Sequence, residues 1–368
     1  ANGVAVDGVT LKDGAVGAAG TATSVAGIPL FTADNSIYTH DVSGTDSTAQ
    51  FNVAYGLTAL DAITTGDSNV AVGYAAGSAV TTGGDNIAIG TNALDGITTL
   101  SGTIAIGLNA LGGALTGTGN TAVGVLAGAA ATGMDKSVLI GYEAGNDITD
   151  GGHTIMIGYQ AGDGFDTETH NLGIGEAALG GPIAGGEYNV AVGNFTLDAL
   201  TTGDNNTAIG YNAGSAAFSD DNVFVGFKAG ETITSGGATA LDQATTEAHN
   251  IAIGYQSMSA DVAGGEYNVA VGNYTLDALT SGDQNTALGH NAATRVTTSN
   301  YSTYLGSEAG VQVTTGEHNV AVGYQSGGSE TTSTGNENTC IGNYAGFGLT
   351  SGNSNTLLGY DSGNNLTT

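Results

Sequence analysis

The chain has 368 residues, of which 64 are glycine and only two are proline, and it contains no tryptophan. Four Lys and Arg residues stand against 34 carboxylates, which gives a formal net charge of −30. Binding to nucleic acid or to an anionic lipid surface requires clustered Lys and Arg, so this charge argues against both. An apolar fraction of 40% is too high for a solvated, disordered chain. The glycines therefore indicate a regular structure.

The single cysteine, Cys340, cannot form a disulfide within the chain. It occupies a position of the repeat described below that is usually alanine, so we expect a small buried thiol rather than a reactive one. No segment is apolar over a length that could cross a bilayer, and no signal peptide is evident. We therefore expect no direct membrane insertion.

Residues 1–50 do not share the pattern that fills the rest of the chain. The stretch Ala5–Gly14 reads as two short strands with glycine turns, and residues 28–31 and 36–40 add apolar material. The ends of a repeat array expose unpaired edges and need a cap. We interpret residues 1–50 as an N-terminal cap or an attachment segment.

From residue 52 onward, the phrase Asn-x-Ala-(Ile/Val)-Gly recurs with small variations in 18 copies. Its glycine falls 17 residues apart at Gly56, Gly73, Gly90, Gly107, Gly124, Gly141, Gly158 and Gly175. It continues at Gly193, Gly210, Gly226, Gly254, Gly272, Gly289, Gly306, Gly323, Gly342 and Gly359. The longest step, of 28 residues, contains an insertion near residues 233–247 that we interpret as a surface loop. Self-similarity of this kind predicts a repeat architecture.

Each copy contains a three-residue alternation of large and small side chains. In Val70-Ala71-Val72, as in most copies, bulky β-branched residues flank an alanine. A period of two predicts a short strand with two different faces. We interpret the Val and Ile face as a thin core, and the alanine face as a flat apolar surface.

A glycine follows each strand, and an asparagine ends the polar turn that precedes it. The glycine permits torsions that other residues avoid, and the asparagine can bond to local backbone. Asparagine occupies its position in 14 of 18 copies, with Thr103, Ser137, Thr154 and Ser302 in the others. Stacking of the copies predicts a ladder of amides. These ladder positions are represented by Asn69, Asn86, Asn206, Asn250 and Asn319, and by Gly73, Gly90, Gly210, Gly254 and Gly323.

Seventeen residues are too few for a helix pair or a propeller blade, but they suit one coil of a β-solenoid. The sequence therefore predicts an all-β fold, a parallel β-solenoid of about 18 coils of about 17 residues. The coils would occupy residues 51–363, followed by a tail at 364–368, and would stack at roughly 4.8 Å.

The alanine face bears on the oligomeric state, because a monomer would leave this apolar face wet. We therefore expect a homo-oligomer, and a trimer is the natural closed form. Larger residues that interrupt the alanine column would fill gaps between subunits, or would mark a face that is partly outward. They are Leu139, Met156, Phe224, Tyr304 and Leu357.

The phrases Asn69–Gly73, Asn86–Gly90 and Asn250–Gly254 resemble the head repeats of trimeric autotransporter adhesins. The fuller phrase Gly203–Ala213 is more similar to repeats of bacteriophage tail fibres. The resemblance covers roughly residues 52–363, and it implies a left-handed parallel β-roll, three intertwined chains and attachment to a surface. The coils are longer than those of the adhesin heads, and neither a coiled-coil stalk nor a membrane-anchor barrel follows them. These departures favour the virion fibre over the autotransporter.

Acidic residues recur six positions before the repeat glycine. On stacked coils, carboxylates in one column would lie roughly 5 Å apart and would repel unless they were screened or bridged. Ca²⁺ accepts several oxygen ligands and could bridge them, whereas a solvated acidic stripe is the plainer interpretation. The candidate calcium ligands are Glu187, Asp204, Asp220, Glu266 and Asp283.

Other chemistry is weakly indicated. Six histidines are scattered without metal-ligand spacing, and we interpret them as residues of surface turns. Adjacent threonines such as Thr64-Thr65 point to opposite sides, which favours structural ladders over an ice-binding face. Tyrosine follows the repeat glycine in seven coils, where packing is favoured over contact with glycans. The narrow coil and the single arginine argue against a solenoid enzyme that acts on polysaccharide, so we expect no enzymatic activity.

These patterns favour a structural fibre or adhesin of a virion that mediates or supports attachment to a glycan or protein of a host surface. The alternative is a bacterial cell-surface adhesin or a subunit of an extracellular filament. In either case we expect the chain at the virion surface or outside the cell. Its partners would be further copies of itself, and other virion or cell-surface proteins bound through the N-terminal segment.

Overall fold

The fold is described from a computed structural model of the chain. The structure describes residues 48–164, 166–181, 185–215, 220–230, 249–260, 264–328, 331–364 and 366–367, together with five short strands between residues 4 and 38. The predicted loop near residues 233–247 lies outside the described residues.

Strands are the only regular elements of the described residues, and none of these residues forms a helix that could cross a lipid bilayer. The first strands are β1 (Val4–Val6), β2 (Val9–Leu11), β3 (Thr23–Val25), β4 (Ile28–Ala33) and β5 (Ser36–Tyr38). The repeat array then contributes β6 (Val53–Tyr55), β7 (Val70–Val72), β8 (Ile87–Ile89), β9 (Ile104–Ile106), β10 (Thr121–Val123), β11 (Val138–Ile140) and β12 (Ile155–Ile157). It continues with β13 (Leu172–Ile174), β14 (Val190–Val192), β15 (Thr207–Ile209), β16 (Val223–Val225), β17 (Ile251–Ile253), β18 (Val269–Val271), β19 (Thr286–Leu288), β20 (Thr303–Leu305), β21 (Val320–Val322), β22 (Thr339–Ile341) and β23 (Thr356–Leu358).

The chain divides into two units, residues 1–167 and residues 168–368. In the first unit, β1 pairs with β2, β3 with β4, and β4 with β5, all antiparallel. Strand β5 then runs parallel to β6, and the parallel ladder continues to β12. In the second unit, a parallel ladder runs from β13 to β23.

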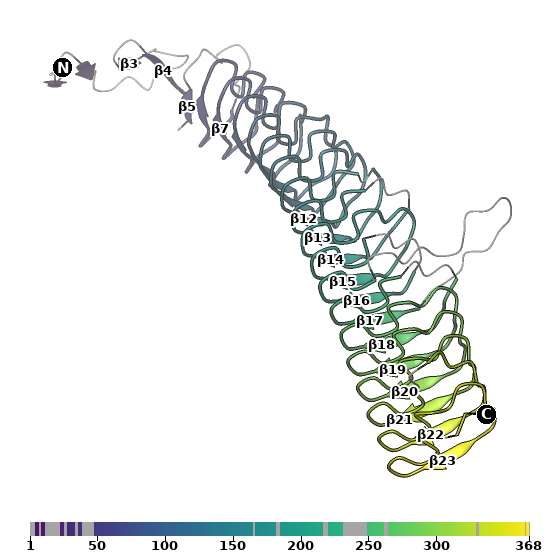
Figure 1. Cartoon of the computed structure of the whole chain (residues 1–368). Helices are drawn as coiled ribbons and strands as arrows, with labels where there is room; N and C mark the ends of the chain where they lie inside the picture. Colours follow the sequence, from purple (N-terminus) through teal and green to yellow (C-terminus); the bar gives the residue numbers. More distant parts are fainter. Residues whose placement is uncertain are drawn as a thin grey trace. The chain divides into compact units, whose positions relative to one another are not determined.

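The predicted fold class is confirmed: the chain is an all-β parallel solenoid of about 17 turns (Figure 1). Each strand pairs residue for residue with the equivalent strand of the next coil, so that Val70 lies opposite Ile87 and Val72 opposite Ile89. Backbone hydrogen bonds between coils continue beyond the strands, for example from the amide of Gly90 to the carbonyl of Val72 at 2.8 Å. Like residues therefore lie above like residues around the whole coil.

The assignment of the two strand faces from sequence was wrong. The alanines point inward and are buried, and Ala71, Ala105 and Ala208 are 0% exposed. The Val and Ile residues on either side point outward, and Ile89 and Ile209 remain 37% and 43% exposed. The strand places one residue inside and two outside, and the inward residue shares the interior with buried side chains from the rest of the turn, such as Leu94 and Ile97. An alanine at the inward position fits beside these side chains, so the two bulky residues face outward.

Four of the five larger residues of the inward column are buried, contrary to the expectation that they lie between subunits or face outward, and the fifth, Leu357 in the last strand, is half-buried. Leu139, Met156, Phe224 and Tyr304 are all 0% exposed. Each is followed six residues later in its own coil by a glycine. The pairs are Leu139 with Gly145, Met156 with Gly162, Phe224 with Gly230 and Tyr304 with Gly310.

Contacts explain this pairing of large residues with glycine. A Cβ atom on Gly310 would lie 2.2 Å from Cδ1 of Tyr304. Where the inward strand residue is Ala105, the same later position instead holds the buried Leu111. No coil therefore has a large side chain at both positions. Where both positions are small, as at Ala71 and Gly77, a large side chain of the adjacent coil, Leu60, reaches the space, as close packing requires.

The repeat glycine is required by both torsion and space. Gly210 has φ of +137°, and a Cβ atom there would lie 2.3 Å from the carbonyl oxygen of Gly226 in the next coil. The coil also turns at non-glycine residues with left-handed torsions, which the sequence did not reveal. Most coils of the described residues have two or three such positions, as at Ser68 (φ +60°), Ala75 (φ +54°) and Leu94 (φ +57°).

We predict that the exchange of bulk in the core can be transplanted. Tyr304→Ala alone should destabilise the coil by roughly 3–5 kcal/mol through a cavity, and Gly310→Leu alone by roughly 1–3 kcal/mol through overpacking. The double variant recreates the Ala105 and Leu111 pattern and should recover more than half of the combined loss. Urea unfolding midpoints of the four proteins measure the coupling, and strictly additive shifts would contradict this account of the core.

Candidate functional site

The asparagine column lies inside the coil and links successive coils. Asn69 is 1% exposed, and its backbone amide donates to Oδ1 of Asn52 at 2.8 Å. Its Nδ2 donates to the same oxygen at 3.1 Å and to the carbonyl of Gly83 at 2.9 Å. The same pattern joins Asn206 to Asn189. Each buried amide is thus satisfied by its neighbours in the stack, which makes this column structural.

The acidic column forms a second ladder, on the surface. Asp204 accepts the backbone amide of Glu187 at 2.7 Å, and its own amide donates to Asp220 at 2.8 Å. Likewise, Asp283 accepts the amide of Glu266 at 2.9 Å. Asparagines occupy the same column elsewhere with the same bond, as when the amide of Glu317 donates to Oδ1 of Asn336 at 2.8 Å.

This ladder changes what the five candidate calcium ligands do. One oxygen each of Asp204, Asp220 and Asp283 already accepts a backbone amide of the adjacent coil. Across the described ranges, no three His, Cys, Asp or Glu residues converge in a way that could hold a metal ion. The sequence already showed that Asp and Asn alternate in this column. That alternation indicates that the position requires a side-chain oxygen that accepts a hydrogen bond, and not a negative charge. Calcium bridging stays a prediction.

The threonine column also joins coils through its hydroxyl groups. Oγ1 of Thr64 donates to the carbonyl of Thr81, and Oγ1 of Thr81 to that of Thr98, both at 3.0 Å. The bond recurs in the second unit from Thr280 to Thr297 at 3.0 Å. These hydroxyl groups therefore act as rungs between coils.

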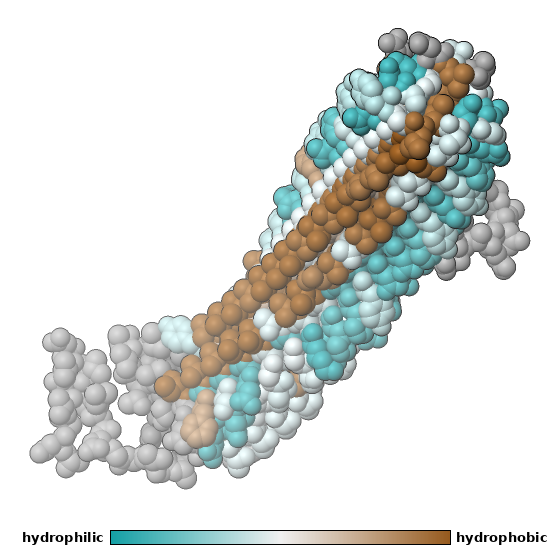
Figure 2. All heavy atoms as spheres, turned by 90° about the horizontal axis from the view of Figure 1, so that it is seen from below, coloured by the Kyte–Doolittle hydropathy of each residue, from teal (hydrophilic) through white to brown (hydrophobic). Residues whose placement is uncertain are grey.

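The outward side of the strands is the most distinctive surface. The residues three positions and one position before the repeat glycine form two columns, which we call the outward ranks. Every member is Val, Ile, Leu or Thr, except Tyr55. Figure 2 shows apolar side chains gathered in a stripe on this face. Members such as Ile140 (38% exposed), Ile253 (37%), Leu288 (43%) and Leu305 (42%) remain open to solvent.

Aromatic residues border the outward ranks on the side where each strand ends. Tyr142 and Tyr159 stack with ring centroids 5.4 Å apart and planes 8° from parallel. In the second unit, Phe227 stacks on Tyr211 at 5.3 Å and on Tyr255 at 5.4 Å. Because stacked rings cover one another's faces, these columns present mainly ring edges outward. A sugar that stacks on a ring face would find few free faces here.

Histidines border the ranks on the side where each strand begins. Four of the six occupy one column, five residues before the repeat glycine: His153, His170, His249 and His318. This common position could have been found in the sequence by aligning the repeats, although the histidines were interpreted there as scattered. His40 lies outside the described residues. Three of the four stack on tyrosines of the same column: His170 on Tyr188, His249 on Tyr267, and His318 on Tyr301.

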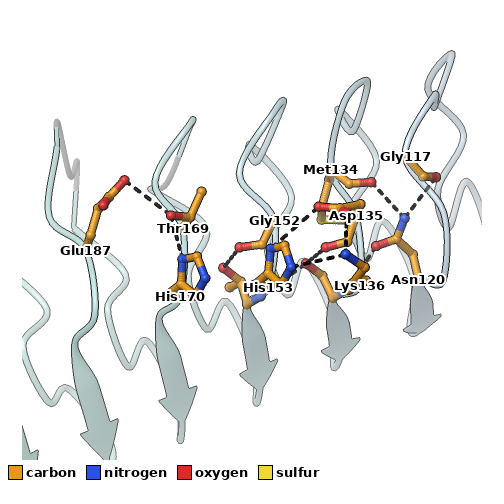
Figure 3. Close-up of polar contacts among 12 residues, drawn as sticks. Gly117, Asn120, Met134, Asp135, Lys136, Gly152, His153, Thr169, His170 and Glu187 are labelled. Carbon is orange, nitrogen blue, oxygen red and sulfur yellow. Dashed lines mark hydrogen bonds and ion pairs between the residues drawn. The ribbon is translucent and has the colours of Figure 1, made fainter.

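Charged groups gather beside this column. In the first unit, Lys136 Nζ lies 3.4 Å from Asp135 and 3.4 Å from Nε2 of His153 (Figure 3). In the second unit, Oγ1 of Thr169 donates to Glu187 at 3.2 Å, and His170 contacts the same hydroxyl at 2.9 Å. These contacts tie neighbouring turns together.

Cys340 is the buried thiol that its repeat position predicts. It is 2% exposed, and burial raises the pKa of its thiol to about 11. At neutral pH the thiol is therefore protonated and a poor nucleophile. It lines a small internal void with Tyr304, Ala321 and Gly327, where the strand residue and the later glycine are both small.

No family model matches the chain, and no curated protein matches its sequence.

We predict that the acidic column contributes through its acceptor oxygens. Asp283→Asn should leave the thermal midpoint within a degree or two, because the amide oxygen can still accept the Glu266 amide. Asp283→Ala leaves that amide without its acceptor and should cost about 1 kcal/mol. Thermal unfolding followed by circular dichroism compares the two variants, and equal losses would contradict the ladder.

The same proteins test calcium bridging. If Ca²⁺ joins this column, adding it should raise the midpoint of the wild-type chain and raise that of Asp283→Asn less. A midpoint that does not respond to Ca²⁺ in either protein leaves the column as a hydrogen-bonded ladder alone.

A pH dependence follows from Asp277. Burial raises the pKa of this carboxyl from 3.8 to about 6, because the charged form loses hydration. The fold therefore favours the protonated form, so the contribution of Asp277 to stability rises as the pH falls from about 7 to about 4. We predict that Asp277→Asn raises the thermal midpoint at pH 7, and that this gain disappears below pH 4. A gain independent of pH would show that charge is not the cause.

Proposed function

We propose that this chain is a structural, non-catalytic subunit of a virion fibre, in which copies associate through the outward ranks and support attachment to a host surface. The observation that carries the proposal is the stripe of exposed aliphatic side chains along the strands of a chain whose net charge is −30. The outward ranks contain no charged residue in any of the 18 coils. The acids lie in other columns.

Energetics support self-association along this stripe. A side chain such as Ile209, which is 43% exposed, contributes on the order of 1 kcal/mol when an apolar partner covers it. Every coil has an aliphatic residue or, once, a tyrosine directly before the repeat glycine, so the contributions of these partly exposed side chains can together exceed an association cost of about 4–15 kcal/mol. A partner that matched every coil would need the same repeat along its length, and a further copy of this chain has it.

A structural role is also supported by how the side chains are used. The asparagine, acidic and threonine columns bond to adjacent coils, and the inward columns fill the core. A left-handed β-roll, three copies and a host-surface glycan or protein as the target rest on the resemblance to tail-fibre and adhesin repeats. Other virion proteins would bind through residues 1–50.

We predict that one charge in the outward ranks abolishes association. Leu288→Asp should convert the oligomer to a folded monomer, because burying an unpaired carboxylate in the interface is costly. Ser281→Asp is the matched control, since it adds the same charge to an exposed turn seven residues earlier. Sedimentation gives the mass, and circular dichroism reports the fold. A wild-type chain that is monomeric at micromolar concentration would contradict self-association.

Attachment to a particle is tested separately. Immunogold labelling of purified virions with an antibody against this chain should decorate projections from the particle surface. Labelling of cell envelopes instead would favour the cell-surface adhesin.

A further inference from the structure

Two exposed columns flank the outward ranks. The leading column lies five residues before the repeat glycine, just ahead of the strand, and the trailing column directly follows that glycine. Both expose large side chains: Tyr188 (53%) and Tyr301 (53%) in the leading column, and Tyr74 (55%) and Tyr159 (51%) in the trailing column. Six residues that include an extended strand separate the two columns in one coil, roughly 15 to 20 Å.

The tyrosines of the two columns lie in different coils, whereas the first coil holds a large apolar residue in each column, Phe51 and Leu57. Each tyrosine of the leading column shares its coil with a small polar trailing residue. These pairs are Tyr188 with Asn194, Tyr267 with Asn273, and Tyr301 with Ser307.

Each tyrosine of the trailing column in turn shares its coil with a leading residue other than tyrosine. These pairs are Ser68 with Tyr74, Lys136 with Tyr142, His153 with Tyr159, Asn205 with Tyr211, His249 with Tyr255, His318 with Tyr324, and Ser354 with Tyr360. The one acid of the trailing column, Glu176, shares its coil with His170. No coil has tyrosine in both columns.

Hydrogen bonds within one chain explain part of this pattern, because the trailing residues Asn194 and Asn273 each accept a backbone amide of the preceding coil. Ring contacts join neighbouring coils, as between His170 and Tyr188 or between Phe227 and Tyr255. Neither kind of contact links the leading residue of a coil to the trailing residue of the same coil, so neither explains why tyrosine avoids one column where it occupies the other. A ring of copies supplies a reason, because in a closed rotational assembly the same two unlike edges meet at every interface. With the outward ranks facing a common axis and the strands running the same way, the trailing column of one copy meets the leading column of the next.

We propose that copies of this chain associate in coil-for-coil register, with the trailing column of one copy packed against the leading column of its neighbour. In every coil that has a tyrosine in one of these columns, that tyrosine then meets a small polar residue, a lysine or a histidine, and Glu176 meets His170. This inference rests on the proposed self-association and adds its register and its contact surfaces.

Cysteine pairs test the register. In a Cys340→Ala background, the variant His318→Cys/Tyr324→Cys carries one thiol in each column of the same coil. The two thiols of one chain are too far apart to join, since a disulfide requires Cα atoms within about 7 Å. Oxidation, or a short bismaleimide, should therefore link different chains into one closed covalent oligomer. The pair His318→Cys/His290→Cys, displaced by two coils or roughly 10 Å, should link poorly, and neither His318→Cys nor Tyr324→Cys should link alone.

The outcomes separate this inference from its premise. Preferential linking of the displaced pair would overturn the register, and linking of either single-cysteine variant would indicate like edges in contact. An intact oligomer that no pair links would overturn the flank contact but leave self-association standing. A monomer in sedimentation would overturn both.

A steric variant gives an independent reading. Ser307→Tyr places tyrosine in both columns of the Tyr301 coil and should raise the dissociation constant of the oligomer at least tenfold. Thr91→Tyr is the control, because its coil has Asp85 in the leading column, and it should change the constant less than threefold. Equal effects of the two variants would contradict the complementarity.

Discussion

The hydrogen bonds that hold each coil to the next in register are the interaction on which the rest of the structure depends. A coil of about 17 residues encloses too little volume to be stable by itself, so its stability arises between coils. Asn69 illustrates the principle: its buried amide bonds both to Asn52 in the preceding coil and to Gly83 in the following one. An unpaired buried amide would cost about 1–3 kcal/mol, so a break in this ladder penalises neighbouring coils together.

Stacking in register turns each position of the repeat into a column with one chemical role. The inward columns together must fill the interior without overfilling it. For this reason Tyr304 shares its coil with Gly310, whereas Ala105 shares its coil with Leu111. The column at the turn must supply an acceptor oxygen for a backbone amide of the adjacent coil. Aspartate and asparagine both supply one, and the column therefore holds Asp283 in one coil and Asn336 in another. The outward ranks neither fill the core nor supply side-chain acceptors. Their residues are therefore the ones whose identity reports on partners.

The outward ranks and their two flanks form a single surface of unusual composition. It is apolar in the centre and free of charge there, while tyrosine, histidine and polar residues line its edges. A chain with 34 carboxylates has no charged residue in the outward ranks of any coil, and its acids lie in other columns, including the two flanks. Such an arrangement lets copies approach despite their net charge, and salt in the surrounding medium screens the remaining repulsion. Because the same short sequence phrase recurs in each coil, the same surface chemistry recurs from coil to coil.

The sequence by itself determined the parallel solenoid, the length of its coils and the columns that stack, because a repeat every 17 residues leaves few other ways to satisfy the backbone. It also placed Cys340 in the core. Only the tertiary structure decided which strand face is inside. Alternation in Val70-Ala71-Val72 defines two faces but not their direction, and hydrophobicity alone favoured valine within. The rest of the turn reversed that choice, because buried side chains such as Leu60 and Val80 already fill the interior beside Ala71 and leave no room there for two valines. The sequence likewise showed the acidic column only as a row of charges. The tertiary structure shows that its carboxylates accept backbone amides, as Asp283 accepts the amide of Glu266.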